Sequence, residues 1–109
     1  YNIVHKRIDI KNWSGNQKSS GCLPHERAWL DHIYDELGYV DTFRVVRTEA
    51  ELYSWWSNRG KARAKNVGWR IDYHACSPDW KARTTNAWVY KEQWFSDHAP
   101  VIIDYKINE

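Results

Sequence analysis

The chain has 109 residues, and its 16 basic and 14 acidic side chains give a formal net charge of only +2. The length suits one domain with a modest core, the charge excludes a polycation, and no stretch is apolar enough to span a membrane. Cys22 and Cys76 lack a metal-binding spacing, so neither zinc nor a disulfide framework is expected, and the reducing cytoplasm fits. Most of the eight tryptophans and seven tyrosines are expected in the core or at interfaces.

A polar loop and a helix are the first elements along the chain. Residues 8–21 are rich in Asn, Ser, Gly and Lys, which predicts an irregular loop. A helix is expected to begin at Pro24, since proline suits the first helical position, and to end at Gly38. Its buried face is predicted from apolar residues at helical spacing, namely Leu30, Ile33, Tyr34 and Leu37.

The rest of the chain predicts mainly short strands. β-branched and aromatic residues or simple alternation predict strands over residues 40–45, 53–56, 69–76, 88–90 and 101–107. Strands outnumber helices and are linked too closely for a regular parallel βαβ array. An α+β fold with a mixed, mostly antiparallel sheet and a covering helix is therefore expected.

A histidine between a carboxylate and a proline is the first candidate for chemistry. In Ser96-Asp97-His98-Ala99-Pro100 the proline favours an extended Ala99, which leaves His98 at the edge of the last strand. An imidazole there can meet a phosphate in its charged or neutral form. Asp72 is the candidate partner that would orient the ring, because an acid in an apolar strand is costly to bury unpaired. A surface Asp-His pair without a role, and a pairing of Asp72 with Arg70 or water, stay open.

A basic stretch flanked by tryptophans is the second candidate. No acid lies between Glu51 and Asp72, whereas five basic residues do, namely Arg59, Lys61, Arg63, Lys65 and Arg70. Such a patch beside aromatic rings suits a polyanion better than a membrane, and the rings can receive an unstacked base or a sugar. Trp55, Trp56 and Trp69 bracket the stretch, and alternation sends Trp55 and Trp56 to opposite faces. A solvated basic loop and ordinary core packing are the alternatives.

Several motifs resemble the exodeoxyribonuclease III and abasic-site (AP) endonuclease family, within the endonuclease, exonuclease and phosphatase superfamily. Residues 62–73, which read Ala-Arg-Ala-Lys-Asn-Val-Gly-Trp-Arg-Ile-Asp-Tyr, are similar to the DNA-repair branch in particular. Residues 1–5 resemble the end of the family's Gly-Asp-x-Asn segment, and residues 23–30 its Pro-x-Glu-Arg helix. The Ser-Asp-His of residues 96–98 occurs across the superfamily. The resemblance covers essentially the whole chain.

The resemblance implies a DNase I-like, four-layer α/β sandwich, with residues 1–109 as the carboxyl-terminal part of a single domain. The amino-terminal half would be absent, so this chain alone is expected to lack a complete active site. The implied activity is DNA repair by hydrolysis of DNA phosphodiesters at abasic sites, at 3′ ends or at both, with Mg²⁺ or Mn²⁺. Double-stranded and abasic-site DNA are the expected partners, and the full-length enzyme is expected to be a monomer.

The resemblance also implies a role for each matching residue. His98 would contact the scissile phosphate as a base or transition-state stabiliser, with Asp72 as its carboxylate partner, and Asn2 would orient the phosphate or the nucleophile. Asp97 would position the metal ion or its bound water. Trp55, Trp69 and Ile71 would wall the pocket for the extruded abasic sugar. Contacts to the DNA backbone are expected from Arg63, Lys65 and Asn66.

Two other functions fit the same sequence. A non-catalytic DNA-binding module would keep the basic stretch and bind duplex DNA in a salt-dependent way without cleaving it. A superfamily phosphatase would hydrolyse a small phosphoester. The motifs leave the balance between exonuclease and endonuclease activity open.

Overall fold

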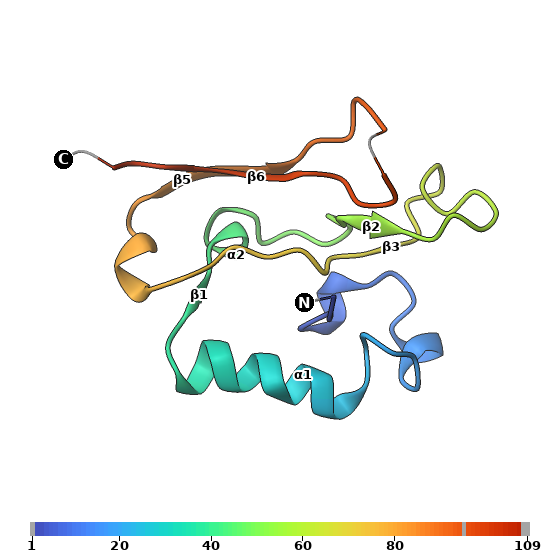
Figure 1. The fold of residues 1–109 in the computed structure, drawn as a ribbon, viewed down its shortest axis with the longest axis horizontal. Coiled ribbons are helices and arrows are strands. Elements are labelled where there is room, and N and C mark those ends of the chain that lie inside the picture. Colours follow the sequence, from blue (N-terminus) through green and yellow to red (C-terminus); the bar gives the residue numbers. More distant parts are fainter. Residues whose placement is uncertain (1, 95, 108–109) are drawn as a thin grey trace.

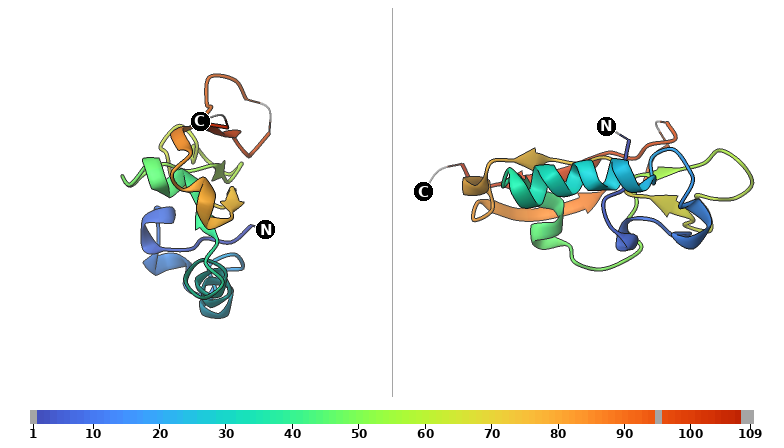
Figure 2. Two further views of the ribbon diagram at one scale, coloured as in Figure 1. Left: turned by 90° about the vertical axis from the view of Figure 1, so that its left-hand side faces the viewer. Right: turned by 90° about the horizontal axis from the view of Figure 1, so that it is seen from below.

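The computed structural model describes residues 2–94 and 96–107 of the chain. Helix α1 (Pro24–Asp31) runs along one side of the molecule, and a ribbon of β5 (Thr84–Val89) and β6 (Val101–Tyr105) runs along the opposite side (Figure 1). The molecule is flat, with extents of 47 × 34 × 21 Å, as the two turned views show (Figure 2).

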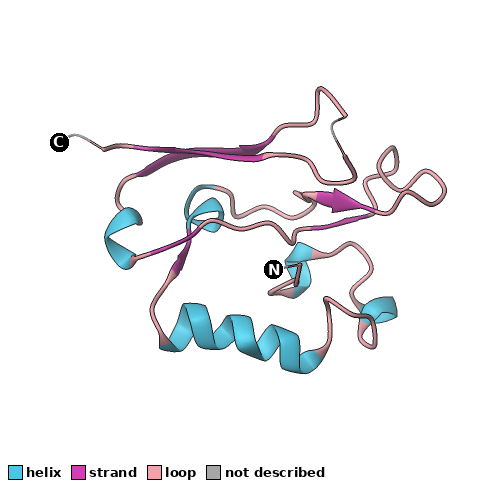
Figure 3. Cartoon of the chain, in the orientation of Figure 1, coloured by secondary structure: helices cyan, strands magenta, loops and turns pink. Residues whose placement is uncertain are grey.

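A middle layer separates the helix from the ribbon, and much of it is loop (Figure 3). Its regular elements are β1 (Val40–Asp41), α2 (Thr42–Val46), β2 (Trp55–Trp56), β3 (Gly68–Trp69) and β4 (Ala75–Cys76). β1 pairs with β4 and β2 with β3, both antiparallel. In the described residues the sheet is thus three two-stranded ribbons instead of one mixed sheet. Among these residues no helix is long and apolar enough to cross a membrane.

Helix α1 begins where the sequence predicts. Pro24 occupies the first turn, where its missing N–H removes no helical hydrogen bond. The Glu26 carboxylate accepts hydrogen bonds from the backbone N–H groups of Gly21 at 2.7 Å and Leu23 at 3.0 Å. This carboxylate replaces the Ser, Thr, Asp or Asn cap that the sequence lacks, and its charge lies at the favourable end of the helix dipole.

The end of the helix is also close to the prediction. A π-helical turn over His32–Glu36 continues α1, and Gly38 then adopts a φ of +80°, a conformation that favours glycine. Leu30 is fully buried, as expected for the inner face, whereas Leu37 is 57% exposed. The wider π turn, with more residues per turn than an α-helix, shifts the last apolar position off the buried face.

The strand predicted over residues 40–45 is wrong after Asp41, because the chain turns there into α2. The side chains of Thr42 and Phe43 are buried, and the Thr42 N–H and hydroxyl both donate to the His74 carbonyl at 3.2 Å. Tertiary contacts at the start of α2 therefore override the β-propensity of the valines that follow.

The predicted strand over residues 69–76 is interrupted, because only its two ends, in β3 and β4, are paired as strands. The backbone N–H groups of Ile71 and Asp72 donate to the Ser54 hydroxyl, both at 3.2 Å, where a strand would donate to carbonyls. The ladder between β2 and β3 therefore stops after Trp69.

The carboxyl-terminal ribbon is longer than predicted on one strand and shorter on the other. β5 extends from Thr84 to Val89, whereas the sequence indicated a strand only over residues 88–90. β6 ends at Tyr105, two residues before the predicted end at Ile107, which is 69% exposed. The two strands pair in antiparallel register, with Ala87 opposite Ile103.

Two apolar clusters form the core. The first joins the amino-terminal loop to the middle layer through Val4, Ile10, Cys22 and Ile71, with Trp13, Trp55 and Trp69 packed against it. The second consists of Tyr53, Trp56 and Ala99. Trp55 and Trp56 thus contribute to different clusters, as strand alternation predicted. Cys22 and Cys76 are both free thiols.

A buried ion cluster lies beside the core. The Arg70 guanidinium donates to Asp9 Oδ1 at 2.8 Å and to Asp41 Oδ2 at 2.5 Å, and Arg44 Nη2 donates to Asp9 Oδ1 at 2.6 Å. The side chains of Arg70 and Asp9 are only 2% and 1% exposed. Burial alone would raise the pKa of Asp9, but the attraction of Arg70 and hydrogen bonds from both arginines hold it below its usual value.

Candidate active site

Backbone pairing brings three distant segments together around Trp55. This residue is bridged antiparallel to His98 on one side and pairs with Trp69 on the other. The Ala99 N–H donates to the Ser54 carbonyl at 2.8 Å, which extends the contact on the histidine side. The Asp-His dipeptide and the tryptophans that flank the basic stretch therefore lie side by side.

Two glycines permit this close packing. A Cβ on Gly68 would lie 2.6 Å from Trp56 Nε1, so only glycine lets β3 approach β2 so closely. Gly21 has a φ of +91°, and a Cβ there would lie 2.9 Å from the Asn2 carbonyl and 3.1 Å from the Trp69 ring. Gly21 thus allows the amino-terminal segment to lie against the tryptophan.

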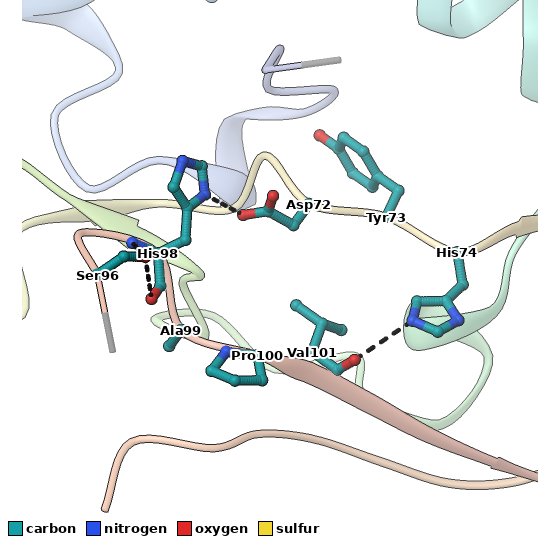
Figure 4. A pocket seen from close by; sticks show the side chains of 8 residues that line it. All are labelled: Asp72, Tyr73, His74, Ser96, His98, Ala99, Pro100 and Val101. Carbon is teal, nitrogen blue, oxygen red and sulfur yellow. Dashed lines mark hydrogen bonds and ion pairs between the residues drawn. The ribbon is translucent and has the colours of Figure 1, made fainter. Parts of the chain in front are cut away.

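His98 and Asp72 contact each other directly. His98 Nδ1 lies 2.8 Å from Asp72 Oδ2 (Figure 4). The same oxygen accepts a hydrogen bond from the Ser54 hydroxyl at 2.6 Å. The side chains of His98 and Asp72 are 34% and 36% exposed, so the pair lies at the surface and is open to a ligand. Arg70, the alternative partner for Asp72, binds Asp9 and Asp41 instead.

The contact with Asp72 fixes which ring nitrogen of His98 carries the proton. An ionised carboxylate only accepts hydrogen bonds, so Nδ1 must be the donor when the ring is neutral. Nε2 is then free of a proton and can accept one from water. When the ring is protonated, Nε2–H can instead donate to an oxyanion such as a phosphate. Both chemistries require the orientation that Asp72 imposes.

A cavity of about 340 Å³ opens beside the pair and brings together most of the predicted site residues. It is lined by Asn2, Ser20, Trp55, Trp69, Ile71, Asp97 and His98. The rings of Trp55 and Trp69 meet edge to face, with centroids 5.8 Å apart and an interplanar angle of 84°. A second hollow of about 350 Å³ borders His98 and Asp72 on the side of His74 (Figure 4).

Asp97 is the carboxylate that lines the first cavity. Its Oδ2 accepts a hydrogen bond from Trp55 Nε1 at 3.0 Å, which orients the group. Within the described part of the chain, no cluster of three His, Cys, Asp or Glu side chains could enclose a metal ion. Mg²⁺ keeps several waters and often binds through one or two carboxylates together with substrate phosphates. Asp97 therefore fits one ligand position of such a site and not a closed cage.

The structure gives Arg63 a packing partner on each side. Its guanidinium lies 4.8 Å from the centroid of the Trp56 ring and 4.3 Å from that of the Trp94 ring. This stack joins the basic loop to the segment that precedes the Asp-His dipeptide. The Arg63 guanidinium therefore packs against aromatic rings and does not extend freely into solvent, where a DNA backbone would meet it.

The two other residues of the basic loop differ from each other. The Asn66 side chain accepts a hydrogen bond from Trp56 Nε1 and donates one to the Glu51 carbonyl, both at 3.0 Å, and its φ is +54°. Lys65 is exposed. Of the three predicted backbone contacts, Lys65 alone is exposed, whereas Asn66 anchors the loop and lies, like Arg63, half-buried.

Sequence reasoning missed Ser54, which touches Asp72 and is completely buried. A single serine within an aromatic run carries no signal of such a contact. Near the same site, His74 contacts the Val101 carbonyl at 3.3 Å and the Tyr105 hydroxyl at 3.2 Å.

Comparison with known proteins identifies the family. A model of the Endonuclease/Exonuclease/phosphatase family matches residues 1–98. The chain is 41% identical to an exodeoxyribonuclease of Bacillus subtilis over 101 residues, which cover 92% of this chain and 40% of that protein. It is 35% identical to the DNA repair nuclease APEX1 of Danio rerio over 103 residues, which cover 94% of this chain and 33% of that protein. The chain therefore belongs to the Endonuclease/Exonuclease/phosphatase family, as its motifs predicted.

Solved structures agree with this result. A 3′-5′ exonuclease from Neisseria meningitidis superposes with a TM-score of 0.88 and 29% identity, over 97% of this chain and 43% of that one. An AP endonuclease from Leishmania major superposes with a TM-score of 0.90 and 26% identity, over 98% of this chain and 33% of that one. These neighbours confirm the α+β, DNase I-like fold class. The chain spans less than half the length of each of these four proteins.

The family to which the chain belongs is one of metal-dependent hydrolases. One further neighbour, with a TM-score of 0.83 and 28% identity, is a 3′ phosphatase from Neisseria bound to a product DNA hairpin. Family membership does not assign a role to any single residue of this chain.

Proposed function

We propose that these residues form one wall of the active site of a DNA-repair nuclease, which hydrolyses DNA phosphodiesters at abasic sites, at 3′ ends or at both. The contact between His98 Nδ1 and Asp72 Oδ2 at 2.8 Å, at the edge of a cavity walled by tryptophans, carries this proposal. Residues 1–109 would be the carboxyl-terminal part of a single domain, and the enzyme would act as a monomer in the cytoplasm.

His98 would act on the scissile phosphate. With Nδ1 held by Asp72, its Nε2 faces away from the carboxylate and can take a proton from water or donate to the phosphate oxygens in the transition state. Asn2, exposed at the rim of the same cavity, offers an amide that can donate to a phosphate oxygen and accept from the nucleophile.

The cavity would receive the sugar. Trp55, Trp69 and Ile71 present apolar surface to a cavity of about 340 Å³, which has room for a deoxyribose. A normal nucleotide would have to lose its stacking and pairing to enter, which costs a few kcal/mol. An abasic site has no such cost, so the cavity favours it.

Asp97 would supply one ligand to Mg²⁺ or Mn²⁺. When bound, such an ion neutralises charge on the phosphate and assists the leaving oxygen. Asp97 lines the cavity, and the hydrogen bond that Trp55 Nε1 donates to its Oδ2 orients the carboxylate.

The test compares His98→Ala and Asp72→Asn with the parent, all in the full-length enzyme, on a labelled duplex that carries one abasic site. General acid-base catalysis typically contributes about 10² to 10⁴ in rate, so kcat is expected to fall by that range in His98→Ala while DNA affinity stays within about twofold. His25→Ala, which removes an exposed histidine on α1, is the matched control and should cleave at the parent rate.

The same assay separates the other functions. Salt-dependent binding of the duplex by the folded protein, with Mg²⁺ and without any cleavage, would show a DNA-binding module. Hydrolysis of a small phosphomonoester in place of both the abasic duplex and a recessed 3′ end would show a phosphatase. Equal turnover of His98→Ala and the parent would overturn the role assigned to the histidine.

A further inference from the structure

We propose that Ser54 is a positioning residue, which fixes the Asp72 carboxylate so that it holds His98 in the tautomer protonated at Nδ1. This inference rests on the proposed function, since it concerns how the same histidine is prepared for chemistry. Ser54 lies immediately before β2 and would touch neither DNA nor a metal ion, because it is completely buried.

The Ser54 hydroxyl has only one group to which it can donate its hydrogen bond. Oγ accepts from the backbone N–H groups of Ile71 and Asp72, both at 3.2 Å, and lies 2.6 Å from Asp72 Oδ2. A hydroxyl has one donor and two acceptor sites, and both acceptor sites are taken by the N–H groups. The proton must therefore go to the carboxylate.

One carboxylate oxygen thus accepts two hydrogen bonds from two directions. Asp72 Oδ2 accepts from Ser54 Oγ at 2.6 Å and from His98 Nδ1 at 2.8 Å. A carboxylate held by a single partner can rotate about its terminal torsion, because that torsion is broad. The second donor restricts the rotation and keeps Oδ2 on the side of the imidazole.

Ser54 also holds the other half of the pair. Its carbonyl accepts from the Ala99 N–H at 2.8 Å, one residue beyond His98. A single buried residue therefore fixes the backbone beside the histidine and the side chain of its carboxylate partner. Asp72 and His98 are each about one third exposed, so water competes for their mutual contact, whereas it does not reach Ser54.

Loss of the Ser54 hydroxyl should change the tautomer of His98. Without this donor, the Asp72 carboxylate can rotate toward water. The neutral imidazole then loses the hydrogen bond to Asp72 that favours the proton on Nδ1. The tautomer with the proton on Nε2 then becomes populated, and in that form Nε2 cannot accept a proton from water. Turnover falls by the same fraction, while substrate binding stays unchanged.

The experiment compares Ser54→Ala, Ser54→Thr and the parent by ¹⁵N NMR of His98 at a pH where its ring is neutral. The ¹⁵N shifts distinguish the protonated from the unprotonated ring nitrogen. The parent and Ser54→Thr, which keeps a hydroxyl, should show the proton on Nδ1, and Ser54→Ala should show a mixture. In parallel kcat should fall about tenfold in Ser54→Ala, with KM within about twofold and with rescue by Ser54→Thr.

Ser77→Ala is the matched control, because Ser77 also donates to an aspartate at 2.6 Å, but in an exposed turn away from His98. It should change neither the tautomer nor turnover. Should Ser54→Ala not fold, Ser54→Cys takes its place, since it fills the site with a much weaker hydrogen-bonding group.

A parent-like tautomer in folded Ser54→Ala or Ser54→Cys, or a proton on Nε2 in the parent, would overturn the proposal. Because the NMR readout needs no turnover, a full-length protein that cleaves no DNA refutes the proposed function and leaves the test of Ser54 intact.

Discussion

Arg70 and Asp72 stand two residues apart, yet they belong to charge clusters of opposite character. Arg70 joins Asp9 and Asp41 in an interior where its side chain is 2% exposed. Asp72 joins His98 at a surface where both side chains keep about a third of their area in solvent. The same segment thus contributes Arg70 to a buried, closed cluster with Asp9 and Asp41, and Asp72 to an exposed, open pair with His98.

The difference shows how a rigid support and a reactive pair can share one backbone. In the closed cluster every carboxylate has a cationic partner, so the charges cannot exchange partners without a large loss of stability. In the open pair the carboxylate is satisfied by Ser54 and His98, and the second ring nitrogen is left for a ligand. The closed cluster fixes the segment from which the open pair acts.

The largest effect is expected from Arg70→Met. This change leaves Asp9 and Asp41 without their shared cation, and breaking a buried pair costs about 3–5 kcal/mol. The free energy of unfolding, measured by denaturation in urea, should fall by that amount. Arg59→Met, which removes an exposed arginine of the basic loop, should stay within about 0.5 kcal/mol of the parent. Similar stability of the two variants would contradict the idea that the closed cluster supports the fold.

Acid should weaken the closed cluster next. The folded-state pKa of Asp9 lies below its usual value, so below a pH of about 3.9 the unfolded chain takes up a proton that the folded chain does not. The stability that Asp9 contributes is therefore present above this pH and is lost as the pH falls through its folded pKa. Urea midpoints measured from pH 5 to pH 2 should fall less steeply in Asp9→Asn than in the parent. Parallel slopes would show that other carboxylates govern the acid transition.

Sequence reasoning recovered what local signals specify. Pro24 and Gly38 mark the helix because their backbone preferences act at the residue itself, and alternation marks β6 because one face of a ribbon is apolar. The sequence predicts a strand at residues 42–45, which lie in α2, because the side-chain contacts that make them helical come from elsewhere in the fold. His98 and Asp72 could be nominated as partners by their chemistry. Ser54 could not, since its role depends on a contact that only the fold creates.

Asn66 extends the comparison to the basic loop, where some residues hold the loop and others face solvent. Asn66→Ala removes two side-chain hydrogen bonds and puts alanine, which tolerates the left-handed region less well than asparagine, at a φ of +54°, so a loss of about 2 kcal/mol is expected. Asn66→Gly loses the same bonds but tolerates the backbone, and it should cost about 1 kcal/mol less. Equal stabilities in urea would show that the backbone conformation contributes nothing.

The smallest effect separates Arg63 from Lys65, which the sequence treats alike. Arg63 stacks between Trp56 and Trp94, so Arg63→Ala should lower the free energy of unfolding by about 1 kcal/mol. Lys65 is exposed, so Lys65→Ala should leave stability unchanged. If Lys65 contacts a phosphate, its removal should reduce the slope of log K against log salt for duplex binding by about 1. An unchanged slope in Lys65→Ala, together with a reduced one in Arg63→Ala, would reverse the assignment: the arginine would then leave its stack to meet DNA, and the loop would be held by Asn66 alone.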